Sequence, residues 1–247
     1  MILRRITKHV KDQNWFAVGL DFIIVVVGIL IAFQITNWNE ARIARAKHDT
    51  YLVRLHNDFE GIRARLERHL DHYADAIEGG DYMLSLIRAE QSELNELQVD
   101  QEVLRRGTET LTSARISPES AATYVEMVSE GQLSDVRPAA LRDKLAEYDR
   151  LLGIVQEVSR ITVDASMRQR NFIYRHIELN SVLDPSNLSG MRLELRSFDL
   201  EGMRSDKYFS IAVITLREDA MNSLGQRRFQ MGLIDEIIEM IEAEIEP

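Results

Sequence analysis

The apolar run from Trp15 to Ile35 limits most strongly what this chain can fold into. It contains one charged residue, Asp21, and as a helix rising about 1.5 Å per residue it would span about 30 Å, the thickness of a bilayer core. Trp15 and Trp38 bracket the run, and tryptophan is typical of the two membrane–water interfaces. The sequence therefore predicts a transmembrane helix over 15–38, with Trp15 and Trp38 as interfacial anchors.

A cleaved signal sequence is the alternative to a retained anchor. The basic start of the chain fits a signal sequence, and Ala44-Arg45-Ala46 has the small-x-small form of a cleavage site. That site lies well beyond Ile35, however, and the apolar run is longer than the usual apolar core of about 7–15 residues. We therefore expect the anchor to stay attached to the mature protein.

The distribution of basic residues bears on the orientation of the helix. Similar numbers of basic residues precede the run and follow it, so the positive-inside rule gives nearly a tie. A short cationic tail is hard to translocate, whereas a long following domain translocates largely regardless of its charge. In a bacterial inner membrane we therefore expect residues 1–14 to be a cytoplasmic tail and 39–247 a periplasmic domain. The basic residues are Arg4, Arg5, Lys8 and Lys11 before the run, and Arg42, Arg45, Lys47 and Arg54 after it.

Small residues gather on one face of the expected transmembrane helix. Gly28 and Ala32 form a small-xxx-small pair, which allows a second helix to approach closely. We expect this face to contact a second copy of the chain or another membrane protein, although small residues are also simply common in such helices. Asp21 lies inside the apolar boundary, where a carboxylate is costly unless it is protonated, hydrated or paired. The predicted packing face consists of Ala17, Asp21, Val25, Gly28, Ala32 and Thr36.

Apolar residues recur at helical spacing through most of the remaining chain. From Leu52 to Ile77 they lie three or four residues apart, which predicts that the transmembrane helix continues as an amphipathic helix. Gly79-Gly80 then weakens or breaks that helix, because glycine is a poor helix former. Since the apolar stripes must be buried against each other, the predicted fold is all-α: one N-terminal transmembrane helix continuing into an elongated antiparallel helical bundle.

Prolines, glycines and polar segments set the expected boundaries of the other helices. Ser117-Pro118-Glu119 has the form of an N-cap, a proline at the first helical position and an acidic first turn. Arg192–Phe198 alternates briefly in the manner of a strand. Helices are expected over about 81–106, from Ser117 to Gly131, from Pro138 to about Asn180 and over about 205–245, with 108–117 and 183–204 irregular.

Charge and composition argue against several classes of protein. The net charge is −10 and no basic patch with interleaved aromatic residues occurs, so we expect no nucleic-acid binding. The absence of cysteine excludes a disulfide framework, a thiolate zinc site and a cysteine nucleophile. No serine-hydrolase, zinc-protease, P-loop or dinucleotide-binding motif is present. We therefore expect a protein that is not an enzyme and holds no cofactor.

Two blocks of the sequence carry a resemblance to a known family. The first is Asp21 followed by VGILIAFQITNWNE over 27–40, and the second joins TYVEM at 123–127 to Gly131-Gln132-Leu133, Leu141-Arg142 and Tyr148. Together they resemble a bacterial domain-of-unknown-function family of single-pass membrane proteins over about residues 15–150. The chain departs from the family pattern at two positions: Asp149 stands where the family usually has a Tyr, and Glu130 stands where Ser is common. The resemblance implies a membrane anchor plus a helical domain and carries no activity.

Two groups of side chains are candidates for ligand chemistry. His69 and His72, with Asp75 beyond them, have a spacing that could hold a metal, but a solvated helix face is the expected interpretation and no metal is predicted. Arg168 and Arg227 (or its neighbour Arg228) interrupt the apolar stripes of the last two long helices. Such residues either receive an anionic ligand or pair with a carboxylate in the core.

The chain after Met231 is acidic and holds no basic residue. We expect it to be the solvated face of the last helix, with a docking surface for a basic partner as the alternative. The acidic residues are Asp235, Glu236, Glu239, Glu242, Glu244 and Glu246.

Two functions follow from these features. The first is a non-enzymatic, membrane-anchored interaction protein that acts as scaffold or adaptor. The alternative is a sensory module whose helical bundle binds a small ligand and signals through a partner membrane protein. A smooth bundle with an exposed apolar seam would favour the first function, and a deep pocket with convergent polar groups would favour the second.

Overall fold

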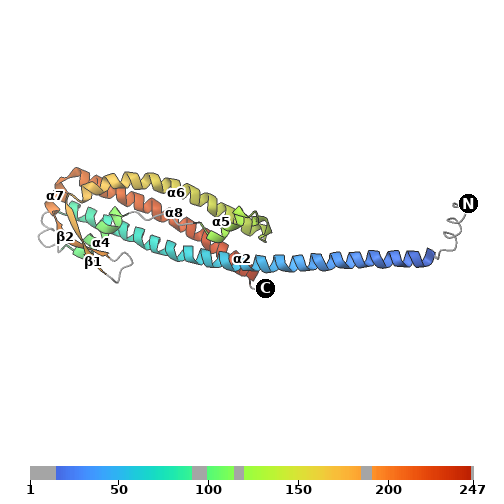
Figure 1. Ribbon diagram of the computed structural model, residues 1–247. Coiled ribbons are helices and arrows are strands. Elements are labelled where there is room, and N and C mark those ends of the chain that lie inside the picture. Colours follow the sequence, from blue (N-terminus) through green and yellow to red (C-terminus); the bar gives the residue numbers. More distant parts are fainter. Residues whose placement is uncertain (1–14, 91–98, 114–119, 185–190, 246–247) are drawn as a thin grey trace, which may run out of the picture. The chain divides into compact units, whose positions relative to one another are not determined.

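The computed structural model describes residues 15–90, 99–113, 120–184 and 191–245, apart from the side chains of 15–18, 161, 162, 164 and 165 (Figure 1). Its contacts divide the chain into two units, Met1–Tyr51 and Leu52–Pro247. Most described residues are helical, as the all-α prediction requires.

Helix α2, Trp15–Arg88, includes the whole apolar run. In the described chain it is the one helix whose length and composition suffice to cross a membrane, with a mean hydropathy of 2.3 over its most apolar window. Large apolar side chains from Leu20 to Trp38 are exposed on it. The protein thus has one long apolar helix near its N-terminus, which by length and composition is a candidate membrane span.

Ion pairs fix the relative direction of α2 and α8, Lys207–Ile245, in the second unit. As the paired residue advances along α2, its partner retreats by the same number of residues along α8, so the two helices run antiparallel. The pairs are His56–Glu242 at 3.1 Å, Arg63–Asp235 at 3.0 Å and Asp81–Arg217 at 2.6 Å.

Helix α6, Ala139–Ile173, also lies antiparallel to α8. Lys144 near its start pairs with Glu236 at 2.7 Å, and Ser166 near its end donates a hydrogen bond to Asp219 at 3.2 Å. The predicted antiparallel bundle is therefore confirmed. Its core buries the expected stripes, including Leu52, Leu55, Phe59, Ile62 and Leu66 of α2, Leu141, Leu145, Tyr148 and Leu152 of α6, and Phe209, Val213, Ile234, Ile238 and Ile241 of α8.

The predicted weakening of the helix at Gly79-Gly80 is wrong, because α2 continues through both glycines to Arg88. The glycines serve packing instead. A Cβ added at Gly79 would lie 2.1 Å from the Cα of Gly107, and one added at Gly80 would lie 3.1 Å from the Cβ of Arg217. Two neighbouring elements therefore approach α2 at this point, and the gain from that contact outweighs the poor helix propensity of glycine.

Helix α4, Gln101–Thr112, corrects two further predictions, a helix over 81–106 and a connection over 108–117. Its N-cap is Asp100, whose carboxylate accepts from the amides of Glu102 and Val103 at 3.0 and 3.1 Å. Three buried threonines end the helix, and each hydroxyl donates to the carbonyl four residues earlier. These bonds are 2.7 Å from Thr108, 2.8 Å from Thr110 and 2.6 Å from Thr112, so polar residues are buried at low cost.

A β-hairpin replaces the predicted end of the Pro138 helix and much of the irregular stretch 183–204. Helix α6 ends at Ile173, and strands β1, Ile177–Leu183, and β2, Met191–Phe198, pair in antiparallel register before the short helix α7, Leu200–Ser205. Between Glu178 and Leu179 the register skips Arg196, which is an extra residue in β2.

Helix α5, Ala122–Ser129, ends close to Gly131 as predicted, and Gly131 has a positive φ of 70°. The predicted cap, Ser117-Pro118-Glu119, lies outside the described residues. A carboxylate of α2 contributes at this N-terminus instead: Asp58 accepts a hydrogen bond of 2.7 Å from the amide of Thr123.

Candidate functional site

A pocket of about 470 Å³ opens among α2, α4, α6 and α8 in the second unit. Part of its wall is apolar and includes Tyr73, Leu111, Val158 and Leu216. Small-molecule sites typically have volumes of about 300–1,000 Å³ and combine apolar walls with a few placed polar groups. This pocket has the size and composition of such a site.

Two opposite charges line the pocket without forming an ion pair. Arg170 comes from α6 and Asp219 from α8. Among the described residues, the Nε of Arg170 is buried and has no hydrogen-bond partner. Asp219 accepts from Ser166 at 3.2 Å, and burial raises the pKa of its carboxyl group above the usual value. A guanidinium and a carboxyl group are thus both available to a ligand.

Small polar side chains complete the polar part of the wall. Ser166 lies one helical turn before Arg170, and Thr112 receives a hydrogen bond of 2.7 Å from the hydroxyl of Tyr174. Hydroxyl and amide groups of this kind orient a ligand through hydrogen bonds and leave room for it. The pocket wall includes Thr110, Thr112, Ser113, Ser159, Ser166, Asn222, Ser223 and Gln226.

Arg227 lies inside the bundle, with 2% of its surface exposed, as its position in an apolar stripe predicts. Its guanidinium donates to the Oε1 of Gln230 at 2.7 Å, and no carboxylate of the described residues lies within ion-pair distance. Arg168, in contrast, is exposed and does not line the pocket. The structure therefore does not bring the two predicted arginines together.

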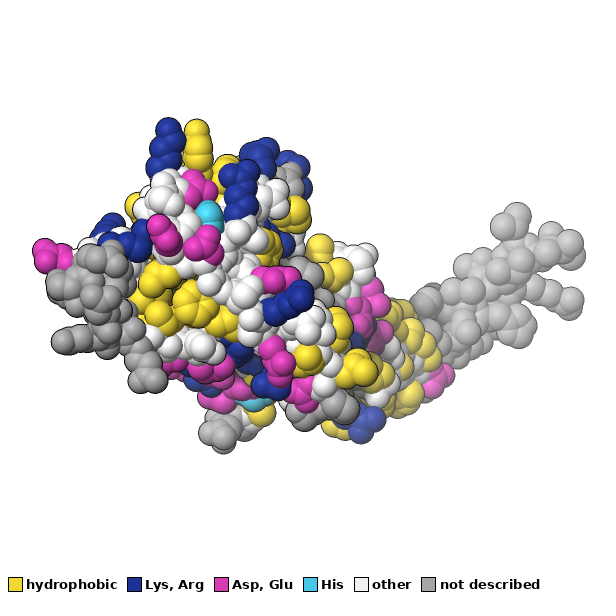
Figure 2. Space-filling view, turned by 90° about the vertical axis from the view of Figure 1, so that its left-hand side faces the viewer, with side chains coloured by type: hydrophobic (Ala, Val, Ile, Leu, Met, Phe, Trp, Pro, Cys, Tyr) yellow, Lys and Arg dark blue, Asp and Glu magenta, His cyan; other side chains and the backbone are white. Residues whose placement is uncertain are grey.

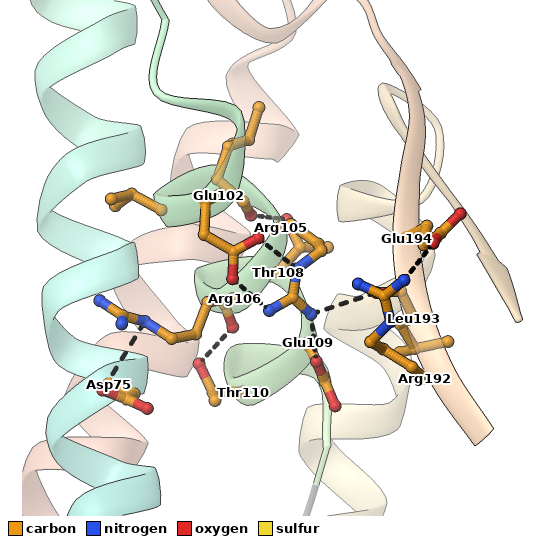
Figure 3. Close-up of polar contacts among 12 residues, drawn as sticks. Asp75, Glu102, Arg105, Arg106, Thr108, Glu109, Thr110, Arg192, Leu193 and Glu194 are labelled. Carbon is orange, nitrogen blue, oxygen red and sulfur yellow. Dashed lines mark hydrogen bonds and ion pairs between the residues drawn. The ribbon is translucent and has the colours of Figure 1, made fainter. Parts of the chain in front are cut away.

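Arg105 of α4 forms a different polar cluster, which joins α4 to the hairpin (Figure 3). Its guanidinium donates to Glu102 at 2.6 Å, to Glu109 at 2.8 Å and to the backbone carbonyl of Leu193 at 3.2 Å. The hydrogen bond with Arg105 lowers the pKa of the Glu102 carboxyl. Each guanidinium nitrogen of Arg105 already donates to an acceptor, so this cluster links α4 to β2 structurally and offers no free group to a ligand.

The predicted solvated face at His69, His72 and Asp75 is wrong for its middle member. His72 is 5% exposed, and its Nε2 lies 3.3 Å from the carbonyl oxygen of Ser113. Asp75 pairs with Arg106 at 3.8 Å. Within the described part of the chain, no group of three or more metal-ligating side chains comes together.

The described acidic residues after Met231 in α8 lie at the solvent-accessible surface of the bundle. Asp235, Glu236 and Glu242 pair with basic residues of α2 or α6, and Glu239 and Glu244 are exposed. Glu246 lies outside the described residues. The predicted solvated face of the last helix is therefore confirmed for its described members, three of which also form surface ion pairs with α2 or α6.

The predicted packing face on α2 is exposed in the first unit where its side chains are described. A Cβ added at Gly28 would meet no atom within 4 Å, and Thr36 donates back to the carbonyl of Ala32 at 3.0 Å. The side chains of Trp15 and Ala17 lie outside the described set. Trp38 is exposed, with the guanidinium of Arg42 5.8 Å from its ring centroid.

Sequence reasoning missed Arg170 and Asp219, although a signal for them exists. Ser159, Val163, Ser166 and Arg170 are four or three residues apart, so small and polar side chains share one face of α6. No family model, curated protein or solved structure matches the chain. The resemblance over residues 15–150 therefore stays a prediction that rests on its two sequence blocks.

Proposed function

We propose that this protein is a membrane-anchored sensory module whose helical bundle binds a small ligand in the pocket between α2, α4, α6 and α8. One observation carries the proposal: Arg170 and Asp219 line the same pocket and are not paired with each other. Opposite charges in a partly buried site are normally paired. A ligand that neutralises both would remove this cost.

The chemistry of the pocket favours a zwitterion of amino-acid size. The guanidinium of Arg170 suits a carboxylate, and the carboxyl group of Asp219 suits an ammonium group. Ser166 supports the ionised form of Asp219, while the apolar wall near Leu111 and Leu216 suits a short aliphatic part. Neither a purely anionic nor a purely cationic ligand would satisfy both charged groups.

The anchor supplies the cellular context. Helix α2 carries both the apolar candidate span and two residues of the pocket wall, Tyr73 and Ala76. In our proposal the span lies in a bacterial inner membrane, the first residues are cytoplasmic and the bundle is periplasmic. A partner membrane protein, or a second copy of the chain, receives the signal through the span.

The test is a thermal-shift screen of the full chain in detergent with free amino acids, their decarboxylated amines and their deaminated acids. We expect at least one amino acid to raise Tm, and its amine and acid counterparts to be much weaker. Arg170→Met and Asp219→Asn should abolish the shift. Arg168→Met and Glu218→Gln, which change exposed neighbours, should keep it. The proposal fails if no zwitterion raises Tm, or if the shift survives in both pocket variants.

The interaction protein remains a second candidate because the hairpin exposes apolar side chains. Leu183 and Met191 lie opposite each other in the sheet register and are 89% and 51% exposed. Figure 2 shows hydrophobic side chains among charged ones on the end of the bundle that carries the strands and α7. If the hairpin docks a partner, Leu183→Lys with Met191→Lys should abolish its co-purification and leave ligand binding unchanged.

A further inference from the structure

The side chain of Arg227 is buried in the bundle and does not line the pocket. It is 2% exposed, and in the described chain no carboxylate pairs with it. Its one printed hydrogen bond goes to a neutral acceptor, the Oε1 of Gln230. An isolated charge in a protein interior is strongly unfavourable unless an opposite charge compensates it. The fold therefore leaves a positive charge in the core that needs a counter-ion.

Three buried polar side chains of the bundle carry donors that lack acceptors among the described residues. The Nε of Arg227, the side-chain nitrogen of Gln230 and the hydroxyl of Tyr148 are all buried without a hydrogen-bond partner. Gln230 is fully buried and Tyr148 is 3% exposed. Since the amide oxygen of Gln230 already accepts from Arg227, what this cluster lacks is an acceptor.

Tyr148 comes from α6 and lies within the electric field of Arg227. Burial raises the pKa of the Tyr148 hydroxyl to about 12, and the charges of Arg227 and Arg65 oppose that rise. The Tyr148 ring is held by Phe59 of α2 in an edge-on contact with 5.3 Å between ring centroids. Three helices thus fix the position of the cluster, which is distinct from the pocket lined by Arg170 and Asp219.

We infer that Arg227, Gln230 and Tyr148 form a buried binding site for a small monoatomic anion of the chloride type. A halide accepts hydrogen bonds from all sides and carries the charge that the guanidinium lacks. A water molecule could accept hydrogen bonds from the same donors but would leave the charge uncompensated. Because the three donors are almost inaccessible to solvent, a small ion suits this site better than a larger anion such as a carboxylate ligand.

The test compares sodium chloride, bromide and gluconate at equal ionic strength on the full chain in detergent. Chloride and bromide should raise Tm above the gluconate value, by about 5 °C at a halide concentration of about 100 Kd. Arg227→Met should abolish the difference between the salts. Arg228→Met, which removes a neighbouring exposed charge, should preserve it.

Tyr148→Phe covers the case in which Arg227→Met does not fold. It removes a hydroxyl that has no partner in the described chain and keeps the ring against Phe59, so the fold should survive while the halide effect weakens. Crystals grown in bromide should show an anomalous peak beside the Arg227 guanidinium. Equal Tm values in the three salts, an undiminished halide effect in the Arg227 or Tyr148 variant, or no anomalous peak would overturn the inference.

Discussion

Gly79 of α2 and Gly107 of α4 are in backbone contact: a Cβ added to Gly79 would lie 2.1 Å from the Cα of Gly107, and one added to Gly107 would lie 2.5 Å from the Cα of Gly79. Both glycines are buried inside helices. Neither side can accept even a methyl group, because the atoms in the way belong to the backbone. The two glycines therefore set the distance between α2 and α4.

Gly79→Ala and Gly107→Ala should each destabilise the protein by about 1–3 kcal/mol, since a helix must move to make room. Gly153→Ala is the matched control: this glycine is exposed in α6, and an added Cβ would meet no atom within 4 Å. It should stabilise the protein by about 0.5–1 kcal/mol through helix propensity. Thermal unfolding in detergent checks both effects. Equal Tm values for the three variants would show that the Gly79–Gly107 contact tolerates an added methyl group.

Arg105→Lys should weaken the attachment of the hairpin to α4. A lysine keeps the charge but cannot donate at once to Glu102, Glu109 and the carbonyl of Leu193, so we expect a loss of about 1–2 kcal/mol. Hydrogen exchange should rise first at the β2 amides. Arg160→Lys alters an exposed pair with Glu157 and should change stability by less than about 0.5 kcal/mol. Equal effects of the two substitutions would contradict the role assigned to Arg105.

We expect the protein to lose stability in acid because the Asp206 carboxyl becomes protonated. The hydrogen bond from His176, followed by backbone amides, lowers the pKa of the Asp206 carboxyl below its usual value. The native state therefore binds this proton less readily than the unfolded state. The stabilisation that the Asp206 carboxylate contributes is fully present above the pKa of this carboxyl group in the unfolded state. It is lost as the pH falls through the lower pKa of the folded state. Urea midpoints measured between about pH 6 and pH 3 should fall less steeply for Asp206→Asn than for the wild type; parallel curves would exclude this contribution.

Long helices were predictable from the sequence because burial and apolar period coincide in them. The stripe from Leu52 to Leu66 is buried as expected, and α8 occupies nearly the predicted range. The helical end of α4 was not predictable in the same way. Its threonines resemble a loop in sequence, and their burial depends on hydroxyl bonds to carbonyls within the same helix.

The candidate sites were only partly predictable. An arginine in an apolar stripe indicates burial, and Arg227 is buried, but the sequence could not say that it would lack a paired carboxylate among the described residues. Arg168 and Arg170 are two residues apart, and only the rotation of α6 decides which of them lines the pocket. Gly79-Gly80 shows the same limit, since a glycine pair predicts a break unless a partner backbone is known to lie against it.

The last prediction concerns the exposed face of α2 in the first unit. If Asp21, Gly28 and Ala32 meet another span, Gly28→Leu should separate the helices, because it adds bulk where an added Cβ now meets nothing within its own chain. Its apolar side chain should leave membrane insertion intact. Leu30→Phe, which adds apolar bulk outside the predicted face, is the control.

Asp21→Leu separates two roles for the carboxylate. Loss of a paired carboxylate would weaken association, whereas loss of one that is merely hydrated at the membrane rim would not. An association reporter fused to the isolated span measures self-association, and co-purification of the full chain measures contact with another membrane protein. A Gly28→Leu variant that behaves like Leu30→Phe in both assays would mean that the small residues of α2 are ordinary membrane composition. The proposed sensory function would then need a route of signalling other than helix contact in the membrane.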